Sequence, residues 1–134
     1  MRKIDVYFYG LFMDEDLLRE KGFLDTNLRP ASLPGFKLHI GKRATLVPAQ
    51  DAKVFGLIGS LSHAELAKLY SESSVQDYRP EAVLAYLSNG EPLAALCFNL
   101  VEPIASNEKN SDYASRLRVL ARRLNFPSDY IDSI

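Results

Sequence analysis

The sequence is poor in the residues that most often bind metals or form covalent crosslinks. Its 134 residues include two histidines, one cysteine and no tryptophan. Cys97 has no second cysteine with which to form a disulfide within the chain, and its apolar neighbours at residues 94–98 predict a buried, unreactive thiol. His39 alternates with apolar residues, which is typical of a sheet face, and His63 lies in the first turn of a predicted helix, where we expect it to be exposed. Their spacing predicts no metal site.

The chain also lacks an excess of either charge. Sixteen basic and seventeen acidic residues give a net charge of -1, which provides no general attraction to nucleic acids or anionic membranes. The one local basic excess, at residues 116–123, is more typical of a solvated helix face. No apolar run reaches the length of a membrane span, and the first residues lack the apolar core of a secretory signal. We therefore expect a cytoplasmic protein that binds neither nucleic acid nor membrane.

What the chain does contain is enough apolar sequence for one core. Its length and 47% hydrophobic content predict a single domain over residues 1–134. Four helices are expected, at 14–21, 63–70, 111–124 and after Pro127; the second begins with a Ser62–Glu65 capping box. Pro30 and Pro34 predict an irregular segment at 23–34. Alternation predicts strands at 3–9, 35–40, 44–47 (ended by Pro48), 54–59, 82–87 and 93–100, the last two joined by Asn89-Gly90.

The order of these elements indicates the fold class. The strands come mostly in pairs rather than in regular alternation with helices. This order favours an α+β fold with a small mixed, strongly curved sheet or barrel and flanking helices. Gly56 and Gly59, inside one apolar strand, suggest a bulge, a bend or the close approach of another group.

The most informative segment is the end of the first predicted strand. Residues 9–13, Tyr-Gly-Leu-Phe-Met, run from that strand through a glycine turn into a helix with three acids in its first turn. Such a turn directs backbone N–H groups and the positive end of a helix dipole at one point. That arrangement favours a carboxylate, a phosphate or a developing oxyanion. The segment is therefore a candidate binding loop, and the chain carries no glycine-rich phosphate motif that would compete with it.

Several segments, in order, resemble the gamma-glutamylcyclotransferase-like family. Residues 9–13 resemble its Tyr-Gly-(Ser/Thr)-x-(Leu/Met) opening. Residues 33–38 (LPGFKL), 44–48 (ATLVP) and 54–58 (VFGLI) resemble its next three strand motifs, and a helix at 64–69 leads to an acid, a tyrosine and a new strand. The likeness spans residues 4–87. It implies a curved-sheet domain that needs no metal or cofactor and acts on a small molecule with a γ-glutamyl group.

The resemblance also implies a reaction and a catalytic acid. The α-amine of a γ-glutamyl group attacks its own γ-carbonyl, 5-oxoproline forms and the attached amine leaves, with one carboxylate as base and then acid. Glu72 is the residue that matches, with Glu81 as second choice, because the family reads Leu-Asp-x-x-Glu where this chain reads Leu69-Tyr70-Ser71-Glu72. A solvated loop acid is the alternative role for Glu72.

The same resemblance predicts the substrate-binding residues. They are Tyr9, Gly10, Leu11 and Phe12 of the loop, together with Tyr78, which either binds substrate or packs in the sheet. Leu11 replaces a Ser or Thr, so a hydroxyl is absent while the backbone N–H groups remain. Met13 is expected in the core.

Two arginines are further candidates for binding a substrate. Arg43 and Arg79 either bind a substrate carboxylate by a two-pronged contact or form surface ion pairs.

The sequence supports three functional hypotheses. The first is a cyclotransferase that releases 5-oxoproline from a γ-glutamyl amine or peptide. The others are a binding module that has lost the chemistry and an enzyme that acts on a different acyl amine.

Overall fold

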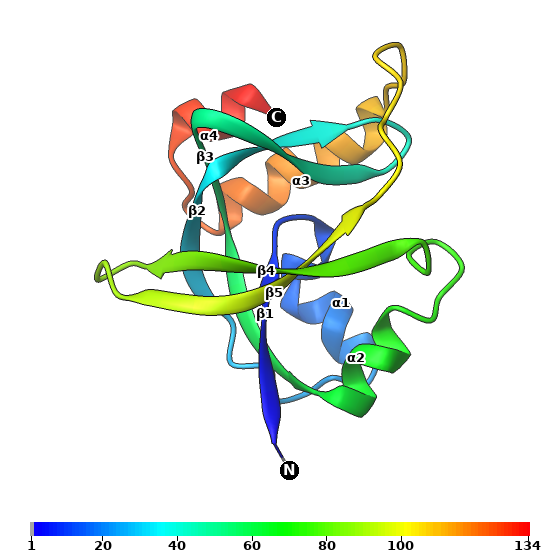
Figure 1. Ribbon diagram of the computed structural model, residues 1–134, viewed down its shortest axis with the longest axis vertical. Helices are drawn as coiled ribbons and strands as arrows, with labels where there is room; N and C mark the ends of the chain where they lie inside the picture. Colours follow the sequence, from blue (N-terminus) through cyan, green and yellow to red (C-terminus); the bar gives the residue numbers. More distant parts are fainter. Residues whose placement is uncertain (1) are drawn as a thin grey trace.

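Five strands form a closed barrel in the order β1-β3-β2-β4-β5 in a computed structural model that describes residues 2–134 (Figure 1). The strands are β1 (Lys3–Phe8), β2 (Arg29–Ile40), β3 (Ala44–Ser62), β4 (Tyr78–Leu87) and β5 (Pro92–Leu100). Neighbouring strands are antiparallel except β1 and β5, which pair in parallel and close the barrel. The predicted α+β class with a mixed, curved sheet is confirmed.

The prediction of two strands at 44–47 and 54–59 is wrong, because β3 is one strand of 19 residues. Pro48 does not end it. The register with β2 passes from Pro34 opposite Lys53 to Phe36 opposite Pro48, so four residues of β3 are accommodated at this shift. Asp51, with a φ of 63°, lies in that extra stretch. A bulge therefore lets one strand bend around the barrel where the sequence suggested two.

The prediction that residues 23–34 are irregular is wrong for their second half. β2 begins at Arg29 and includes both prolines. A strand tolerates proline at a position whose backbone nitrogen is not needed to donate a hydrogen bond to a neighbouring strand. β2 pairs with β4 over only Ala31 and Ser32, so most of that edge of the strand needs no donor.

The hairpin and the helices lie close to their predicted positions. β4 and β5 pair through the Asn89-Gly90 turn, and Gly90 takes a φ of 87° as such a turn requires. The Ser62–Glu65 capping box is present and begins α2 (His63–Leu69). α3 spans Ser111–Arg123, and α4 spans Ser128–Ser133 with Pro127 as its N-cap. α1 is shorter than predicted, at Glu15–Glu20, and follows a 3₁₀ turn, η1 (Leu11–Met13).

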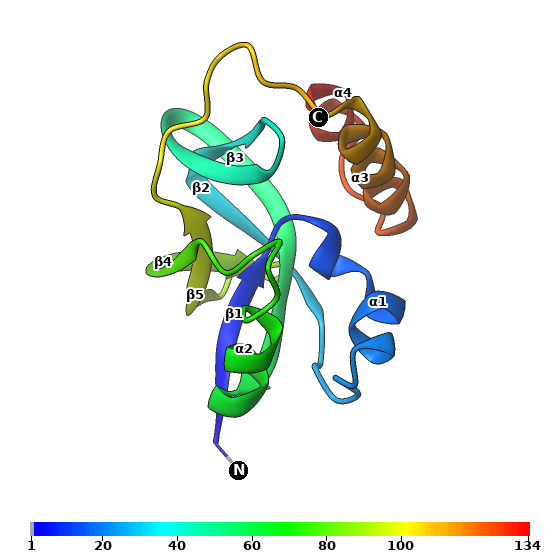
Figure 2. The same cartoon turned by 90° about the vertical axis from the view of Figure 1, so that its right-hand side faces the viewer.

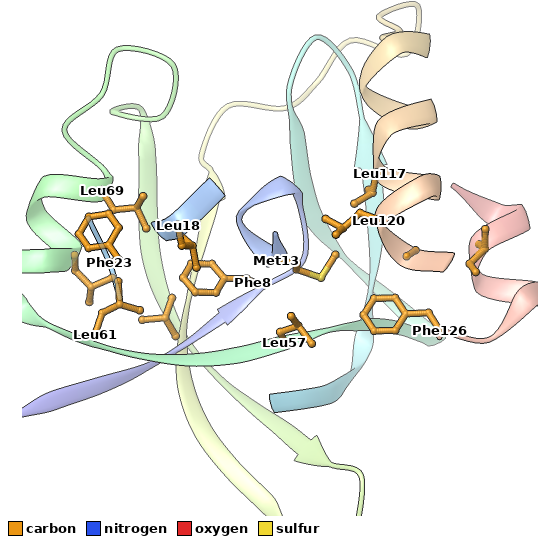
Figure 3. Close-up of a cluster of buried hydrophobic side chains, with 14 residues drawn as sticks. Phe8, Met13, Leu18, Phe23, Leu57, Leu61, Leu69, Leu117, Leu120 and Phe126 are labelled. Carbon is orange, nitrogen blue, oxygen red and sulfur yellow. The ribbon is translucent and has the colours of Figure 1, made fainter. Parts of the chain in front are cut away.

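Two cores lie on opposite faces of β1. Tyr7 and Tyr9 point into the barrel, where they pack with residues such as Ile58 and Cys97. Burial raises the pKa of the Cys97 thiol to about 12, so this thiol stays protonated near neutral pH. Val6 and Phe8 point outward into a second core formed with the helices (Figure 3). Figure 2 shows α1, α3 and α4 on the same side of the barrel, where they cover this outward face.

Close packing explains the glycines of β3. A Cβ at Gly56 would collide with the Phe8 carbonyl and the Tyr7 ring, and one at Gly59 would lie 3.0 Å from the Phe8 ring. The expected close approach of another group is therefore what requires these glycines. By fixing β1 against β3 at Phe8, the packing also fixes the chain where it leaves the barrel toward residues 9–13.

Candidate active site

A cavity of about 390 Å³ opens at the end of β1. A cavity of this size is large enough for a small molecule. It brings together the strand end, the C-terminal end of α1, the turn between β2 and β3, the segment between α2 and β4, and one side of α3. Its lining residues are Tyr7, Phe8, Tyr9, Gly10, Leu11, Phe12, Leu17, Lys21, Lys42, Arg43, Ala44, Tyr70, Glu72, Ser74, Val75, Tyr78, Phe98, Tyr113 and Arg116.

The four predicted loop residues all line this cavity. The Tyr9 hydroxyl donates to the Phe98 carbonyl at 2.7 Å, which ties the end of β1 to β5. Gly10 accepts a hydrogen bond from the Met13 N–H at 3.0 Å, which closes the turn. Phe12 packs edge-on against Phe8 and Tyr70. Met13 is buried in the outward core, as expected.

The prediction that the N-terminus of a helix points at the binding site needs correction. Asp14 caps α1 with its own carboxylate, which accepts from the Asp16 N–H at 3.0 Å. The turn that lines the cavity is instead η1, whose first N–H groups belong to Leu11 and Phe12. The first N–H groups of such a turn have no carbonyl partner within it. The backbone donors that the 9–13 loop offers to this site therefore belong to a single 3₁₀ turn.

Glu72 lies in the wall of the same cavity, between α2 and β4. Its Oε1 atom accepts a hydrogen bond from the Lys21 ammonium at 2.6 Å. The Glu72 side chain is 41% exposed and that of Lys21 is 25% exposed, so the pair is at the edge of the cavity rather than in a dry interior. Among the lining residues that the structure describes, Glu72 is the only acid.

Glu81, the second choice for the acid, is not among the residues that line the cavity. It lies on β4, and its Oε1 atom accepts from the Asn99 amide at 2.5 Å. Asn99 in turn accepts from the Leu46 N–H at 3.2 Å. Glu81 is thus part of a polar network at one end of the barrel.

Tyr78 lines the cavity and is also anchored in the sheet. Its hydroxyl donates to the Ala44 carbonyl, and the Arg43 guanidinium lies 5.7 Å from the centre of its ring. Burial raises the pKa of Tyr78 to about 12. Arg43 lines the cavity and pairs with Asp77 at 3.2 Å. Arg79 does not line it, and donates instead to the carbonyls of Gln76 and Tyr78.

Several lining residues were not predicted from the sequence, and three of them, Lys21, Tyr70 and Tyr113, bear on the chemistry of the site. Lys21 is the last residue of the predicted 14–21 helix, and nothing in the sequence assigns it to the site. Tyr70 stacks on Phe98 with ring centres 3.9 Å apart. Tyr113 lies on α3, and its hydroxyl lies against Gly10, where an added Cβ would collide with it. A tyrosine among the apolar residues of a helix is the sequence feature that could have indicated such a residue, because a buried hydroxyl usually needs a hydrogen-bond partner.

The tyrosines around the cavity are neutral near physiological pH. Burial raises the pKa of Tyr9, Tyr70 and Tyr113, and for Tyr113 a hydrogen bond from the Leu11 backbone offsets part of the rise. Their hydroxyls are therefore hydrogen-bond donors and not bases. The site combines one carboxylate with four cations, Lys21, Lys42, Arg43 and Arg116, over a mainly aromatic floor.

Within residues 2–134, no group of three or more His, Cys, Asp and Glu side chains lies in an arrangement that could hold a metal ion. No helix in that range is long and apolar enough to cross a membrane.

Solved structures share the fold of this chain. A structure named "Gamma-glutamyl cyclotransferase" superposes with a TM-score of 0.80 at 15% identity, over 98% of this chain and 86% of the other. An uncharacterized protein from Homo sapiens gives 0.77 at 15% identity, over 99% and 86%. A protein from Arabidopsis thaliana solved in solution gives 0.70 at 19% identity, over 93% and 87%. The TM-scores of these superpositions establish a common fold.

Sequence comparison places the chain in a family. No curated protein matches it. The family model described as gamma-glutamyl cyclotransferase, AIG2-like, matches residues 6–116. This range includes the second half of β1, the whole of the other four strands, the 9–13 loop, Glu72 and Tyr113. The chain therefore belongs to the gamma-glutamyl cyclotransferase, AIG2-like family.

Proposed function

We propose that this protein is a cyclotransferase that releases 5-oxoproline from a γ-glutamyl amine or γ-glutamyl peptide, with Glu72 as general acid and base. One observation carries the proposal. The loop at Tyr9–Phe12 and the Glu72 carboxylate, 60 or more positions apart in the sequence, line one cavity. The family match supports a reaction of this class.

The reaction needs two proton transfers, which one carboxylate can perform in turn. Glu72 takes a proton from the α-ammonium group of the substrate, and the free amine attacks the γ-carbon, so that a C–N bond forms and an oxyanion develops. Collapse of this intermediate breaks the C–N bond to the attached amine, which receives the proton from Glu72. The ring nitrogen then gives its second proton to Glu72, which passes it to the released amine, so that 5-oxoproline and a protonated amine leave. General acid–base catalysis of this kind contributes about 10²- to 10⁴-fold.

The opposite wall provides hydrogen-bond donors for the oxyanion or for the substrate carboxylate. The Leu11 and Phe12 N–H groups begin η1, and the Leu11 N–H is directed at the Tyr113 hydroxyl. Because Tyr113 is protonated, its hydroxyl can donate onward into the cavity. We propose that this hydroxyl and the Phe12 N–H act together as donors. Such preorganised donors are effective because they need no rearrangement when charge develops.

Arg43 is the better of the two predicted arginines for binding a carboxylate. It lines the cavity, whereas Arg79 is bound to backbone carbonyls outside it. The Arg43–Asp77 pair is half-exposed, with the Asp77 side chain 64% exposed. A substrate carboxylate can therefore compete with Asp77 for the guanidinium at low cost.

The proposal is tested by measuring 5-oxoproline release by mass spectrometry from γ-glutamyl amines, γ-glutamyl amino acids and glutathione. We expect at least one substrate to react, and Glu72→Gln to lower kcat by at least about 10²-fold. Glu81→Gln is the matched control and should change kcat by less than about 3-fold, because Glu81 lies outside the cavity wall.

Other outcomes would favour the remaining hypotheses. A folded protein that releases nothing from the whole panel, yet binds γ-glutamyl compounds, would indicate a binding module. Leu11, which leaves this position of the loop without the hydroxyl of a Ser or Thr, is the observation that favours this alternative. Activity on a different acyl amine would indicate the same pocket with another substrate.

A further inference from the structure

We propose that Lys21 is a positioning residue that holds the Glu72 carboxylate by one oxygen and leaves the other free to exchange protons with substrate. The inference rests on the proposed function of Glu72 and goes beyond it, because it assigns a role to a residue on a different wall of the cavity. The observation is the 2.6 Å contact from Lys21 Nζ to Glu72 Oε1.

The two side chains differ in how firmly their backbones are fixed. Lys21 ends α1, and the chain then turns at Gly22, whose φ is 95°. The Phe23 N–H closes this turn on the Leu18 carbonyl at 2.9 Å, and Leu18 is fully buried. Lys21 therefore extends from a fixed point, and its half-buried stem limits the positions that its ammonium group can take.

Glu72 lies instead in a polar turn between α2 and β4. Its carbonyl accepts from the Val75 N–H at 3.0 Å, while its side chain has one partner among residues 2–134, the Lys21 ammonium. No hydrogen bond to Oε2 is found within that range. The contact with Lys21 is thus what ties this carboxylate to the rest of the fold and determines which oxygen is left free.

The chemistry of the two groups fits this division of roles. An ammonium group donates hydrogen bonds and accepts none, so Lys21 can hold Oε1 without taking the proton that Glu72 must carry. Oε2 is then available to the α-ammonium group of the substrate and later to the leaving amine. Fixing a catalytic group matters because a misplacement of about 1 Å can cost about 10²-fold in rate.

A purely structural role would predict a different result. Ion pairs as exposed as this one contribute little to folding stability. If Lys21 only stabilised the fold, its removal would leave both kcat and KM nearly unchanged. If substrate had to displace Lys21 from Glu72, its removal would lower KM and raise kcat/KM. The positioning role alone predicts a fall in kcat at a nearly constant KM.

The experiment measures kcat and KM for 5-oxoproline release in Lys21→Met and Lys21→Arg. We expect Lys21→Met to lower kcat by about 10- to 100-fold with KM within about 3-fold. Lys21→Arg should recover most of the loss, because a guanidinium also donates to one carboxylate oxygen. Lys68→Met is the matched control, since Lys68 is an exposed lysine beside the same turn that does not line the cavity.

A double variant shows whether Lys21 acts through Glu72. In the Glu72→Gln background, Lys21→Met should have no further effect on the residual rate. An unchanged kcat, a raised kcat/KM or an additive double variant would each overturn the positioning role while Glu72→Gln still supports the proposed function. A wild-type protein that releases nothing, or an active Glu72→Gln, would overturn both. Thermal melts of each variant separate a loss of folding from a loss of rate.

Discussion

The two walls of the cavity are held in place by different kinds of interaction. The barrel wall, formed by Tyr9–Phe12 and Tyr113, is fixed by buried, neutral hydrogen bonds and by the close contact at Gly10. The turn wall, formed by residues 72–78 with Lys21 and Arg43, is held by ion pairs of 2.6 and 3.2 Å between half-exposed side chains. The first arrangement gives fixed geometry, and the second allows charged groups to change partners when substrate enters.

Alkaline pH should have the largest effect, because it acts on buried tyrosines, of which Tyr9 belongs to the barrel wall. Burial raises the pKa of Tyr7, Tyr9 and Tyr70 in the folded state above the ordinary value of about 10. Their contribution to stability is therefore complete below about pH 10 and is lost as pH rises, because only the unfolded chain ionises readily. Urea unfolding followed by circular dichroism should show a steep fall in the free energy of unfolding above about pH 10. A constant midpoint up to about pH 11 would contradict this assignment.

A methyl group at Gly10 should have the next largest effect. The added Cβ of Gly10→Ala collides with the Tyr113 hydroxyl, so either the loop or α3 must shift. We expect about 1–3 kcal/mol of destabilisation and about a 10²-fold lower kcat/KM, because the donors of the loop move with it. Chemical denaturation and 5-oxoproline release measure the two effects.

The double variant Gly10→Ala/Tyr113→Phe identifies the cause. Removal of the hydroxyl relieves the collision, so stability should recover toward that of Tyr113→Phe alone. If stability does not recover, the collision with the Tyr113 hydroxyl is not what requires a glycine at this position.

Removal of the Tyr113 hydroxyl alone should be milder. Tyr113→Phe keeps the ring against the loop and deletes one hydrogen-bond donor from the cavity. We expect about a 10-fold lower kcat, since one donor to a developing oxyanion is lost while the backbone remains. The matched control is Tyr86→Phe, on β4 and outside the cavity wall, which should leave kcat within about 2-fold. Equal effects of the two variants would remove Tyr113 from the site.

The difference between the walls also explains what could be predicted from the sequence. The barrel wall depends on a local pattern, a strand that ends in Tyr9-Gly10, and this pattern was sufficient to place the loop. β3 could not be predicted as one strand, because whether Pro48 ends a strand depends on its partner: here it lies opposite Phe36 beside a bulge. Local signals describe a segment, whereas a bulge is a property of two paired segments.

The turn wall depends on contacts between distant residues, which a single sequence does not reveal. Lys21 and Glu72 are 51 positions apart, and nothing in the local sequence around either one identifies its partner. Tyr113 is spaced with the apolar residues Leu117 and Leu120 of α3, and helical spacing does not distinguish a core ring from a ring whose hydroxyl reaches a cavity. Such residues are found only when the packing of the helix on the barrel is known.

The smallest expected effect is on the exposed ion pair of the turn wall. Asp77→Asn removes the partner of Arg43, and the free energy of unfolding should fall by less than about 1 kcal/mol because the pair is well solvated. KM should fall by about 2- to 3-fold if Arg43 binds a substrate carboxylate, since Asp77 no longer competes for it. Salt at about 0.5 M should reduce this difference in KM by screening both interactions. Glu102→Gln, which alters an exposed acid outside the cavity wall, controls for net charge. A KM that rises in Asp77→Asn would show that Asp77 holds Arg43 in its binding position, and the turn wall would then be as preorganised as the barrel wall.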